Sequence, residues 1–258
     1  MKALVTGGCG FIGSNLVHGL VSEGWGVDVV DDMTNGDLDN LKPLRTRTIT
    51  GQLGHFYKRG KDPIDPEVLV IMDDFCSVEV ARRIINGDYD IIFHLAANPR
   101  VEYTVQNPVA STEHNLFKTV QLMAHSVGNV KRFVMASTSA VYGDPGDSLP
   151  TTESAQIMPE SPYGVQKASC EQFGQTFSKL YDLDTVFLRL FNVYGPRQWG
   201  DSPYSTAISA WCDKIKNRGL LRRDGDGEQT RDLVFVKDVV SAFISAGNRK
   251  KDFKGLPI

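Results

Sequence analysis

The 258-residue chain lacks the signals of several specialised protein classes. It has only four cysteines and no CxxC pair, which indicates neither a disulfide framework nor a cysteine metal site. Its five histidines are scattered without metal-ligand spacing, so no metal is expected. No apolar run approaches the ~20 residues that span a bilayer, and no membrane association is expected.

An excess of charge of one sign is also missing. The net charge is −3, so a basic surface for nucleic acid is not indicated. The opening residues MKALVTGG indicate a strand that enters a turn, and they lack the apolar core of a secretory signal. The cysteines are far apart in the sequence, which favours a reduced, cytoplasmic location; they are Cys9, Cys76, Cys170 and Cys212.

Short apolar runs alternate with helical patterns through most of the chain. This alternation predicts an α/β fold of the Rossmann type, with a doubly wound parallel sheet covered by helices on both faces. Strands are expected at 2–6, 26–31, 67–73, 89–97, 131–137 and 184–190, and helices at 12–24, 77–87, 107–127 and 162–181.

Two regions depart from this alternation. The segment 34–66 is long, polar and poorly patterned, and an extended loop is expected there. After residue 190, Pro, Gly and Asp cluster around one helical stretch at about 206–216. We therefore expect an NAD-binding Rossmann domain at 1–190 and a smaller substrate lobe at 191–258. The alternative is that the chain returns to the Rossmann sheet around 232–247.

The glycine-rich turn TGGCGFIG lies between the first strand and the first helix. Its glycines, Gly7, Gly10 and Gly13, have the spacing GxxGxxG and allow a tight turn, close approach of a pyrophosphate, and close helix packing. The helix N-terminus then offers free N–H groups to phosphates. Asp31 ends the second strand, where a carboxylate binds ribose hydroxyls and repels a 2′-phosphate. With Asp32 beside it, the pattern favours NAD over NADP.

The stretch SPYGVQK places Tyr163 and Lys167 one turn apart at the start of a helix. Ser161 suits the N-cap and Pro162 the first helical position. A nearby ammonium favours the phenolate, so the pair suits a general base, although ordinary surface residues are the alternative. The stretch MASTSAVYG ends the fifth strand at the edge where ligands bind, and its hydroxyls at 137–139 can share a substrate proton.

Taken together, these motifs resemble those of the extended short-chain dehydrogenase/reductase superfamily, in its nucleotide-sugar epimerase/dehydratase branch. The resemblance spans nearly the whole chain in the family's order. It rests on TGGCGFIGS, Asp31, HLAA (His94–Ala97), Asn115, STSAVYG, YGVQK, RLFNVYGP (Arg189–Pro196) and GDGEQTRDLVFVKD (Gly225–Asp238).

The resemblance implies a role for each matching residue. Thr138, Tyr163 and Lys167 would be catalytic, and the last two would also contact the cofactor. Thr138, Asn192 and Arg231 would bind the substrate, a nucleotide-diphosphate sugar. The cofactor, NAD, would be bound by Gly7, Gly10, Phe11, Ile12, Gly13, Asp31, Asp32, Asp73, Asp74, Leu95, Ala96, Ala97 and Asn115.

The resemblance also indicates the reaction. Dehydratases and decarboxylases of the branch typically carry an acid where this chain has Ser139 or Ala140, which favours epimerisation at C4 through a 4-keto sugar. Dehydration or decarboxylation of a nucleotide sugar, reduction of a non-sugar carbonyl, and NAD binding without catalysis are the alternatives. Relatives usually continue for several dozen residues beyond FKGLPI, so the substrate lobe is expected to be incomplete. A homodimer through the helices at 107–127 and 162–181 is also expected.

Overall fold

The computed structural model describes residues 1–50, 67–144, 146, 149–200, 206–221, 223 and 225–258. Within these ranges, eight parallel strands form one sheet with the order β10-β7-β6-β5-β1-β2-β4-β3. The strands are β1 (Lys2–Thr6), β2 (Gly26–Asp31), β3 (Thr46–Thr50), β4 (Val68–Met72), β5 (Ile91–His94), β6 (Arg132–Thr138), β7 (Thr185–Leu190) and β10 (Leu256–Pro257).

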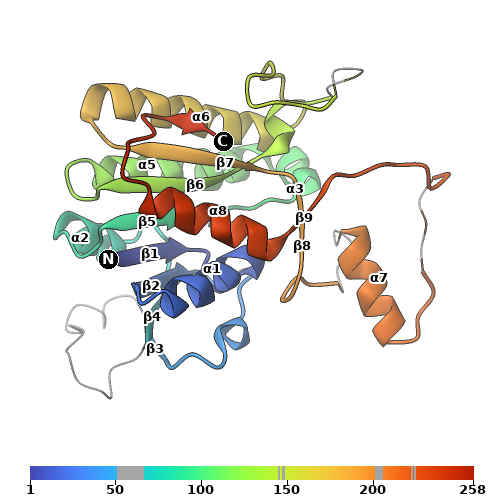
Figure 1. Ribbon diagram of the computed structural model, residues 1–258, viewed down its shortest axis with the longest axis horizontal. Coiled ribbons are helices and arrows are strands. Elements are labelled where there is room, and N and C mark those ends of the chain that lie inside the picture. The colour runs from blue at the N-terminus through green and yellow to red at the C-terminus, as the bar shows by residue number, and fades with distance from the viewer. Residues whose placement is uncertain (51–66, 145, 147–148, 201–205, 222, 224) are drawn as a thin grey trace.

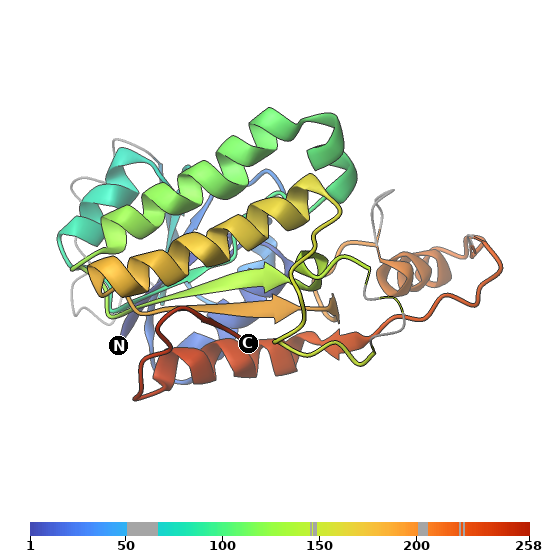
Figure 2. The ribbon, with the colours of Figure 1, turned by 90° about the horizontal axis from the view of Figure 1, so that it is seen from above.

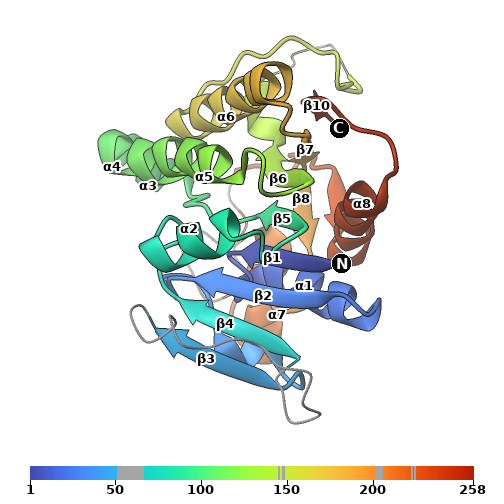
Figure 3. The same ribbon diagram turned by 90° about the vertical axis from the view of Figure 1, so that its left-hand side faces the viewer.

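Helices cover both faces of this sheet (Figure 3). One face carries α1 (Phe11–Ser22) and α8 (Val236–Asn248), and the other carries α2 (Val78–Ile85), α5 (Lys118–Ser126) and α6 (Pro162–Tyr181). Figure 2 shows α6 beside a second helical rod. That rod consists of α3 (Val101–Gln106), α4 (Pro108–Thr112), the π turn η3 (Glu113–Phe117) and α5.

The strand sequences account for the two cores. Because side chains alternate along a strand, neighbouring residues face opposite sides of the sheet. In β1, Ala3 and Val5 pack under α1 and α8, while Leu4 packs on the side of α2 and α5. A strand buried on both faces reads as an uninterrupted apolar run, and VLVIM of β4 is such a run. The expected Rossmann-type fold is confirmed.

The expectation of an extended loop at 34–66 is wrong for the part that the structure describes. A short 3₁₀ turn, η1 (Leu38–Leu41), is followed by β3, which pairs with β4 at the edge of the sheet. In the sequence TRTIT every residue except Arg47 is β-branched, which suits a strand, but most of its side chains are exposed. Its polarity therefore resembles that of a loop. Residues 51–66 of the expected loop lie outside the described ranges.

The helix expected at 107–127 is not one regular helix. Pro108 starts α4 after the separate helix α3, and the π turn η3 interrupts the rod before α5 begins. A π turn inserts one extra residue per turn, which no pattern of apolar residues reveals, and such turns are frequent at functional sites. Here it carries Asn115, which is buried.

After β7 the chain leaves the sheet and later returns to it (Figure 1). The short strands β8 (Asn192–Tyr194) and β9 (Leu233–Phe235) pair with each other, and the helix expected at about 206–216 is found as α7 (Ala207–Lys216). α7 stands away from the sheet, whereas α8 packs against α1 and β10 pairs with β7.

The buried Arg132 holds this returning segment. Its Nε donates to Asp184 at 2.5 Å, and its other nitrogens donate to four backbone carbonyls. Those carbonyls belong to Ala246, Gly247, Arg249 and Lys251. Asp184 in turn accepts hydrogen bonds from the backbone N–H groups of Phe253 and Lys254.

Among the described helices, none has the length and apolar character needed to cross a membrane.

Candidate active site

The candidate residues gather at the carboxyl edge of the sheet, around β1. The chain leaves β1 through α1 to reach β2 on one side, and it later places β5 on the other side of β1. Such a reversal of strand order leaves a crevice at the carboxyl ends of the strands, where ligands of doubly wound proteins bind. The glycine turn, Asp31 and the end of β5 all lie at this point.

The glycine turn is shaped to approach a phosphate closely. Gly7 has φ +68°, a conformation that favours glycine, and a Cβ on Gly13 would lie 2.1 Å from the carbonyl oxygen of Gly7. Gly10 is the N-cap of α1 and offers no side chain to bond the first N–H groups of the helix. The N–H groups at this positive helix end are therefore suited to an anionic ligand. The cradle fits the diphosphate of a dinucleotide.

Asp31 ties this turn to the end of β2. Its carboxylate accepts hydrogen bonds from the backbone N–H groups of Cys9 and Met33, both at 2.9 Å. Burial raises the pKa of Asp31, and these two hydrogen bonds oppose that effect. The carboxylate lies at the carboxyl end of β2, next to the glycine turn. Asp32, beside it, is exposed and accepts from the N–H of Thr34.

The two aspartates after β4 differ in their surroundings. Asp73 follows the strand directly, and its backbone N–H donates to the carbonyl of Asp31, so it adjoins the ribose-binding position. The carboxylate of Asp74 is paired with Lys118 at 2.6 Å and also accepts from the N–H of Cys76. The carboxylate of Asp73 accepts from the backbone N–H of Asp74 at 2.8 Å and, unlike that of Asp74, forms no ion pair with another of the described residues.

His94 lies at the centre of a buried hydrogen-bond network beneath the cofactor crevice. Thr119 donates to the carbonyl of Asn115 at 2.8 Å, so its oxygen accepts from Nε2 of His94 at 2.9 Å. Nδ1 of His94 then accepts from Thr6 at 2.8 Å, and the Thr6 oxygen accepts from the N–H groups of Leu95 and Ala96. Burial lowers the pKa of His94 well below its ordinary value, so the ring is neutral. The network holds the backbone of Leu95 and Ala96; the sequence offered only the motif HLAA as a signal.

The stretch SPYGVQK opens α6, as predicted. Ser161 caps the helix by accepting from the N–H of Gly164 at 3.1 Å, and Pro162 takes the first helical position. Lys167 is buried, donates to the carbonyl of Ala136 at 2.9 Å, and lies 5.9 Å from the centre of the Tyr163 ring. Burial raises the pKa of Tyr163 and lowers that of Lys167 to about 8. Burial therefore disfavours the charged form of each group, and an ammonium near the ring favours the phenolate by charge attraction.

The hydroxyls at the end of β6 point in different directions. Ser137 is buried and donates to Glu171 of α6 at 2.5 Å, which removes it from the crevice. Thr138 accepts from the N–H of Ala140 at 3.2 Å and is partly exposed at the strand end. Of these two hydroxyls, Thr138 is therefore the one that remains available to a ligand.

Behind Ser137 lies an ion pair whose structural role the sequence did not reveal. Glu171 and Arg189 are both buried and joined at 2.6 Å, and Arg189 also bonds the hydroxyl of Tyr142 and the carbonyl of Glu153. The pair connects α6 and β7 to the loop that follows η4 (Ser139–Val141). It braces the segment that presents Thr138.

Of the three residues assigned to the substrate, Asn192 and Arg231 lie on the part that leaves the sheet. Asn192, in β8, donates to the carbonyl of Asp232, and Arg231 is exposed just before β9. β8 and β9 are paired, so the two residues are brought together although they are far apart in the sequence.

Among the described residues, no group of three or more Cys, His, Asp or Glu side chains is arranged to hold a metal ion.

The chain was compared with known proteins. The model of the family described as "NAD dependent epimerase/dehydratase family" matches residues 3–255. A UDP-glucose 4-epimerase of Mycolicibacterium smegmatis is 34% identical over 251 residues, covering 96% of this chain and 73% of that protein.

Solved structures of epimerases have the same fold. A UDP-N-acetylglucosamine 4-epimerase from Methanobrevibacter ruminantium, in complex with UDP-N-acetylmuramic acid, superposes with a TM-score of 0.84 at 33% identity, covering 97% of this chain and 74% of that chain. A UDP-glucose 4-epimerase from Thermotoga maritima, with UDP-glucose, gives a TM-score of 0.83 at 32% identity, covering 98% and 75%.

Proposed function

The chain belongs to the NAD dependent epimerase/dehydratase family, and on this premise we propose that it inverts C4 of a nucleotide-diphosphate sugar. It is an enzyme of the extended short-chain dehydrogenase/reductase type, and its cofactor is NAD. One observation carries the proposal: Tyr163 and Lys167 open a helix at the carboxyl edge of the sheet, beside a strand end that offers Thr138 but no acid.

The side chains of this site supply proton transfer. When bound, NAD supplies reversible acceptance of a hydride. Tyr163 takes the proton of the sugar C4 hydroxyl as C4 is oxidised to a ketone, and it returns this proton when C4 is reduced from the other face. Thr138 shares the hydrogen bond of that hydroxyl. Lys167 holds a positive charge near the phenolate, which lowers the cost of the deprotonated tyrosine.

The residues next to Thr138 favour epimerisation over the family's other outcomes. Elimination or decarboxylation of a 4-keto sugar proceeds more readily with a second group that moves a proton. Ala140 has no such group, and Ser139 is a weak acid. A ketone held without a second base is reduced again, and reduction on the opposite face inverts C4.

A panel of UDP-, GDP-, ADP- and dTDP-sugars, with the products identified by NMR, tests the proposed function. We expect one of them to be converted to its C4 epimer without net consumption of NAD. A 4-keto-6-deoxy or decarboxylated product would contradict the epimerase, and stoichiometric release of NADH would indicate net oxidation of the substrate by a dehydrogenase.

For the cofactor site, we propose the residues expected from the sequence, with Asp31 selecting NAD. Replacing Asp31 with asparagine removes the charge that repels a 2′-phosphate but keeps an oxygen that can accept from Cys9 or Met33. The variant is expected to bind NAD about tenfold more weakly and to lose most of its discrimination against NADP. Fluorescence titration with both nucleotides checks this. The idea fails if the wild type binds NADP more tightly than NAD.

We further propose that residues 1–190 form the NAD-binding domain and that the substrate lobe is drawn from 191–258. Asn192 and Arg231 suit the diphosphate of the sugar nucleotide, because an amide and a guanidinium both donate to phosphate oxygens. In support, β8 and β9 bring the two residues together beyond the carboxyl edge of the sheet.

A homodimer is the proposed assembly. The rod from α4 to α5 and the adjacent helix α6 expose a row of large apolar side chains: Val109 (82% exposed), Phe117 (64%), Val165 (49%) and Phe173 (43%). Apolar side chains gathered on one face indicate an interaction surface. A two-fold pair of copies would bury the same face on each, the commonest arrangement of oligomers.

Light scattering tests the dimer. The wild type is expected to be dimeric at micromolar concentration, and Phe117→Asp is expected to be monomeric, because it places a charge in the proposed interface. Leu220→Asp is the control, since Leu220 is 93% exposed on the projecting part of the chain and should leave the dimer intact. A wild type that stays monomeric across this range would remove the proposal.

We also propose that the protein acts in the cytoplasm. All four cysteines are free, two of them fully buried as thiols, which suits a reducing compartment. Fractionation of cells that express the native protein tests this, and recovery from an oxidising compartment would contradict it.

A further inference from the structure

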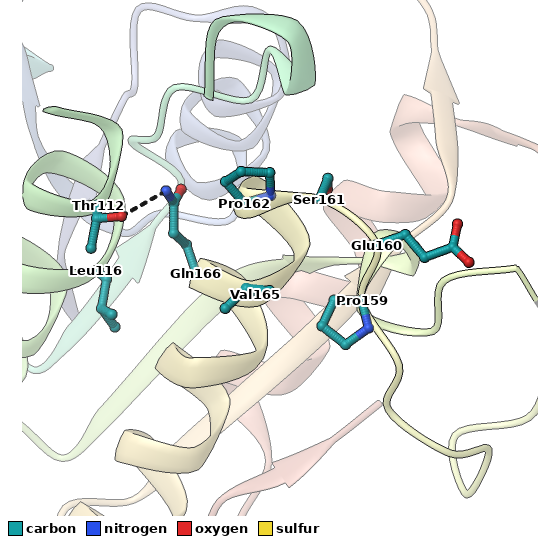
Figure 4. Close-up of a pocket in the computed structure, with 8 residues that line it drawn as sticks. All are labelled: Thr112, Leu116, Pro159, Glu160, Ser161, Pro162, Val165 and Gln166. Atoms are coloured by element: carbon teal, nitrogen blue, oxygen red, sulfur yellow. Dashed lines mark hydrogen bonds between the residues drawn. The ribbon is translucent and has the colours of Figure 1, made fainter. Parts of the chain in front are cut away.

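Gln166 lies between Tyr163 and Lys167 in the sequence but faces away from the crevice, towards the neighbouring helical rod. Its side chain is buried, with 2% of its surface exposed. The amide nitrogen donates to the hydroxyls of Ser111 at 2.9 Å and Thr112 at 3.1 Å, and the amide oxygen accepts from Asn115 at 2.8 Å. Figure 4 shows the contact with Thr112 at the first turns of α6.

The orientation of this amide follows from its neighbours. The hydroxyls of Ser111 and Thr112 both donate to the carbonyl of Pro108, at 3.1 and 2.7 Å, so their oxygens are left to accept. The nitrogen of Gln166 donates to both, and Ser111 is buried away from solvent. The oxygen is then left for the amide nitrogen of Asn115, which is a donor. Glutamine is the side chain that offers a donor and an acceptor at this reach.

Asn115 passes this connection on to the cofactor-lining segment. Its nitrogen also donates to the carbonyl of Asn98 at 3.0 Å, and its oxygen accepts from the N–H of Asn98 at 2.8 Å. Asn98 directly follows Leu95–Ala97, whose backbone lines the crevice at the end of β5. The side-chain amide of Asn115, on the π turn, thus bonds both the backbone of Asn98 and, through Gln166, helix α6.

We propose that Gln166 is a positioning residue that fixes the catalytic turn of α6 relative to the cofactor-lining segment 95–98, acting through Asn115. The inference rests on the proposed function only in that the crevice binds NAD. Without the Gln166 amide, the hydroxyls of Ser111 and Thr112 and the nitrogen of Asn115 each lose a buried partner. The Asn115 amide is then free to turn away from Asn98.

Gln166→Met tests the proposal, since it keeps the length of the side chain but removes both hydrogen-bonding groups. We expect NAD to bind about tenfold more weakly, the cost of one or two buried polar groups left without partners. We also expect faster amide hydrogen exchange at Asn98 in the ligand-free protein. The controls are Gln172→Met, the same change at an exposed site of α6, and Ser126→Ala, which removes a buried hydrogen bond within α5. Both controls should bind NAD within about twofold of the wild type.

A double-mutant cycle with Asn115→Ala separates positioning from a general loss of stability. If Gln166 acts through Asn115, the double variant binds NAD no more weakly than Asn115→Ala alone. Additive losses, or a Gln166→Met variant that melts earlier but binds NAD like the controls, would overturn the proposal. Gln166→Glu, which lacks the amide donor, replaces the Met variant if that does not fold. NAD titration and amide hydrogen exchange use no sugar substrate. Their results therefore test the role of Gln166 even if the protein proves not to be an epimerase.

Discussion

Replacing Tyr163 with phenylalanine is expected to lower turnover by about 10²–10⁴-fold, the usual contribution of general acid–base catalysis. In the proposed mechanism the phenolate of Tyr163 receives the proton of the C4 hydroxyl, and phenylalanine keeps the ring but cannot receive it. The side chain is partly buried at the start of α6, and phenylalanine keeps its ring, so the variant fills the same space. The fold and NAD binding should therefore persist.

Hydride transfer is the measurement that decides the role of Tyr163. It is followed as NADH absorbance in a single turnover with the identified sugar nucleotide. Tyr181→Phe is the matched control, because it is the same change at an exposed position at the end of the same helix. Thr138→Val should fall between the two, since it removes a shared hydrogen bond but leaves the base. Hydride transfer at the wild-type rate in Tyr163→Phe would show that the tyrosine is not the base.

Lys167→Met is expected to have opposite effects on activity and stability. Turnover should fall on the order of 10²-fold and NAD should bind more weakly, because the cation near the phenolate is lost. The ligand-free variant should nevertheless be more stable than the wild type at pH 7, by about 1–3 kcal/mol. Burial of the ammonium costs free energy, as the lowered pKa of Lys167 indicates, and the lost bond to Ala136 offsets only part of this gain.

The pH dependence of this difference follows from the pKa of Lys167, which falls from 10.5 to about 8 on folding. Below pH 8 the lysine is protonated in both states and the full cost is present. Between pH 8 and 10.5 the folded protein has released a proton that the unfolded chain still binds, so wild-type stability gains relative to the variant. Urea denaturation from pH 7 to 10 should show the advantage of Lys167→Met shrinking, with Lys179→Met, exposed on the same helix, as control. An advantage that grows with pH would contradict the assignment.

Local sequence patterns predict the parts of the fold that are governed by neighbouring residues. The apolar runs of β1, β2 and β4 mark buried parallel strands, the glycines mark the turn, and Ser161 with Pro162 marks the start of α6. β3 was missed because an edge strand exposes most of its side chains and needs no apolar run. The packing of α8 on α1 depends on contacts between residues far apart in the sequence, which a local pattern does not reveal.

The candidate site was predictable to a similar extent. Alternation along a strand places Ser137 and Thr138 on opposite faces of the sheet, so their separate roles could have been inferred from β6 alone. The roles of Gln166 and His94 could not, because each depends on hydrogen-bond partners on a different element. A glutamine or histidine looks the same in a sequence whether its side chain is buried and bonded to a neighbouring element or faces solvent.

The contact between α1 and α8 has a consequence for synthesis of the protein. Gly19 of α1 lies so close to Val240 and Ile244 of α8 that a Cβ at Gly19 would be 2.8 and 3.0 Å from their side chains. On the ribosome, at roughly 5–20 residues per second, α8 emerges on the order of ten seconds or more after α1. Throughout that interval α1 packs on β1, β2 and η1, and the part of its apolar face that α8 later covers stays open. Native packing over the helix that begins with the glycine turn is therefore completed only after α8 has been synthesised, and a nascent chain stalled before α8 is expected to bind NAD more weakly than the full chain.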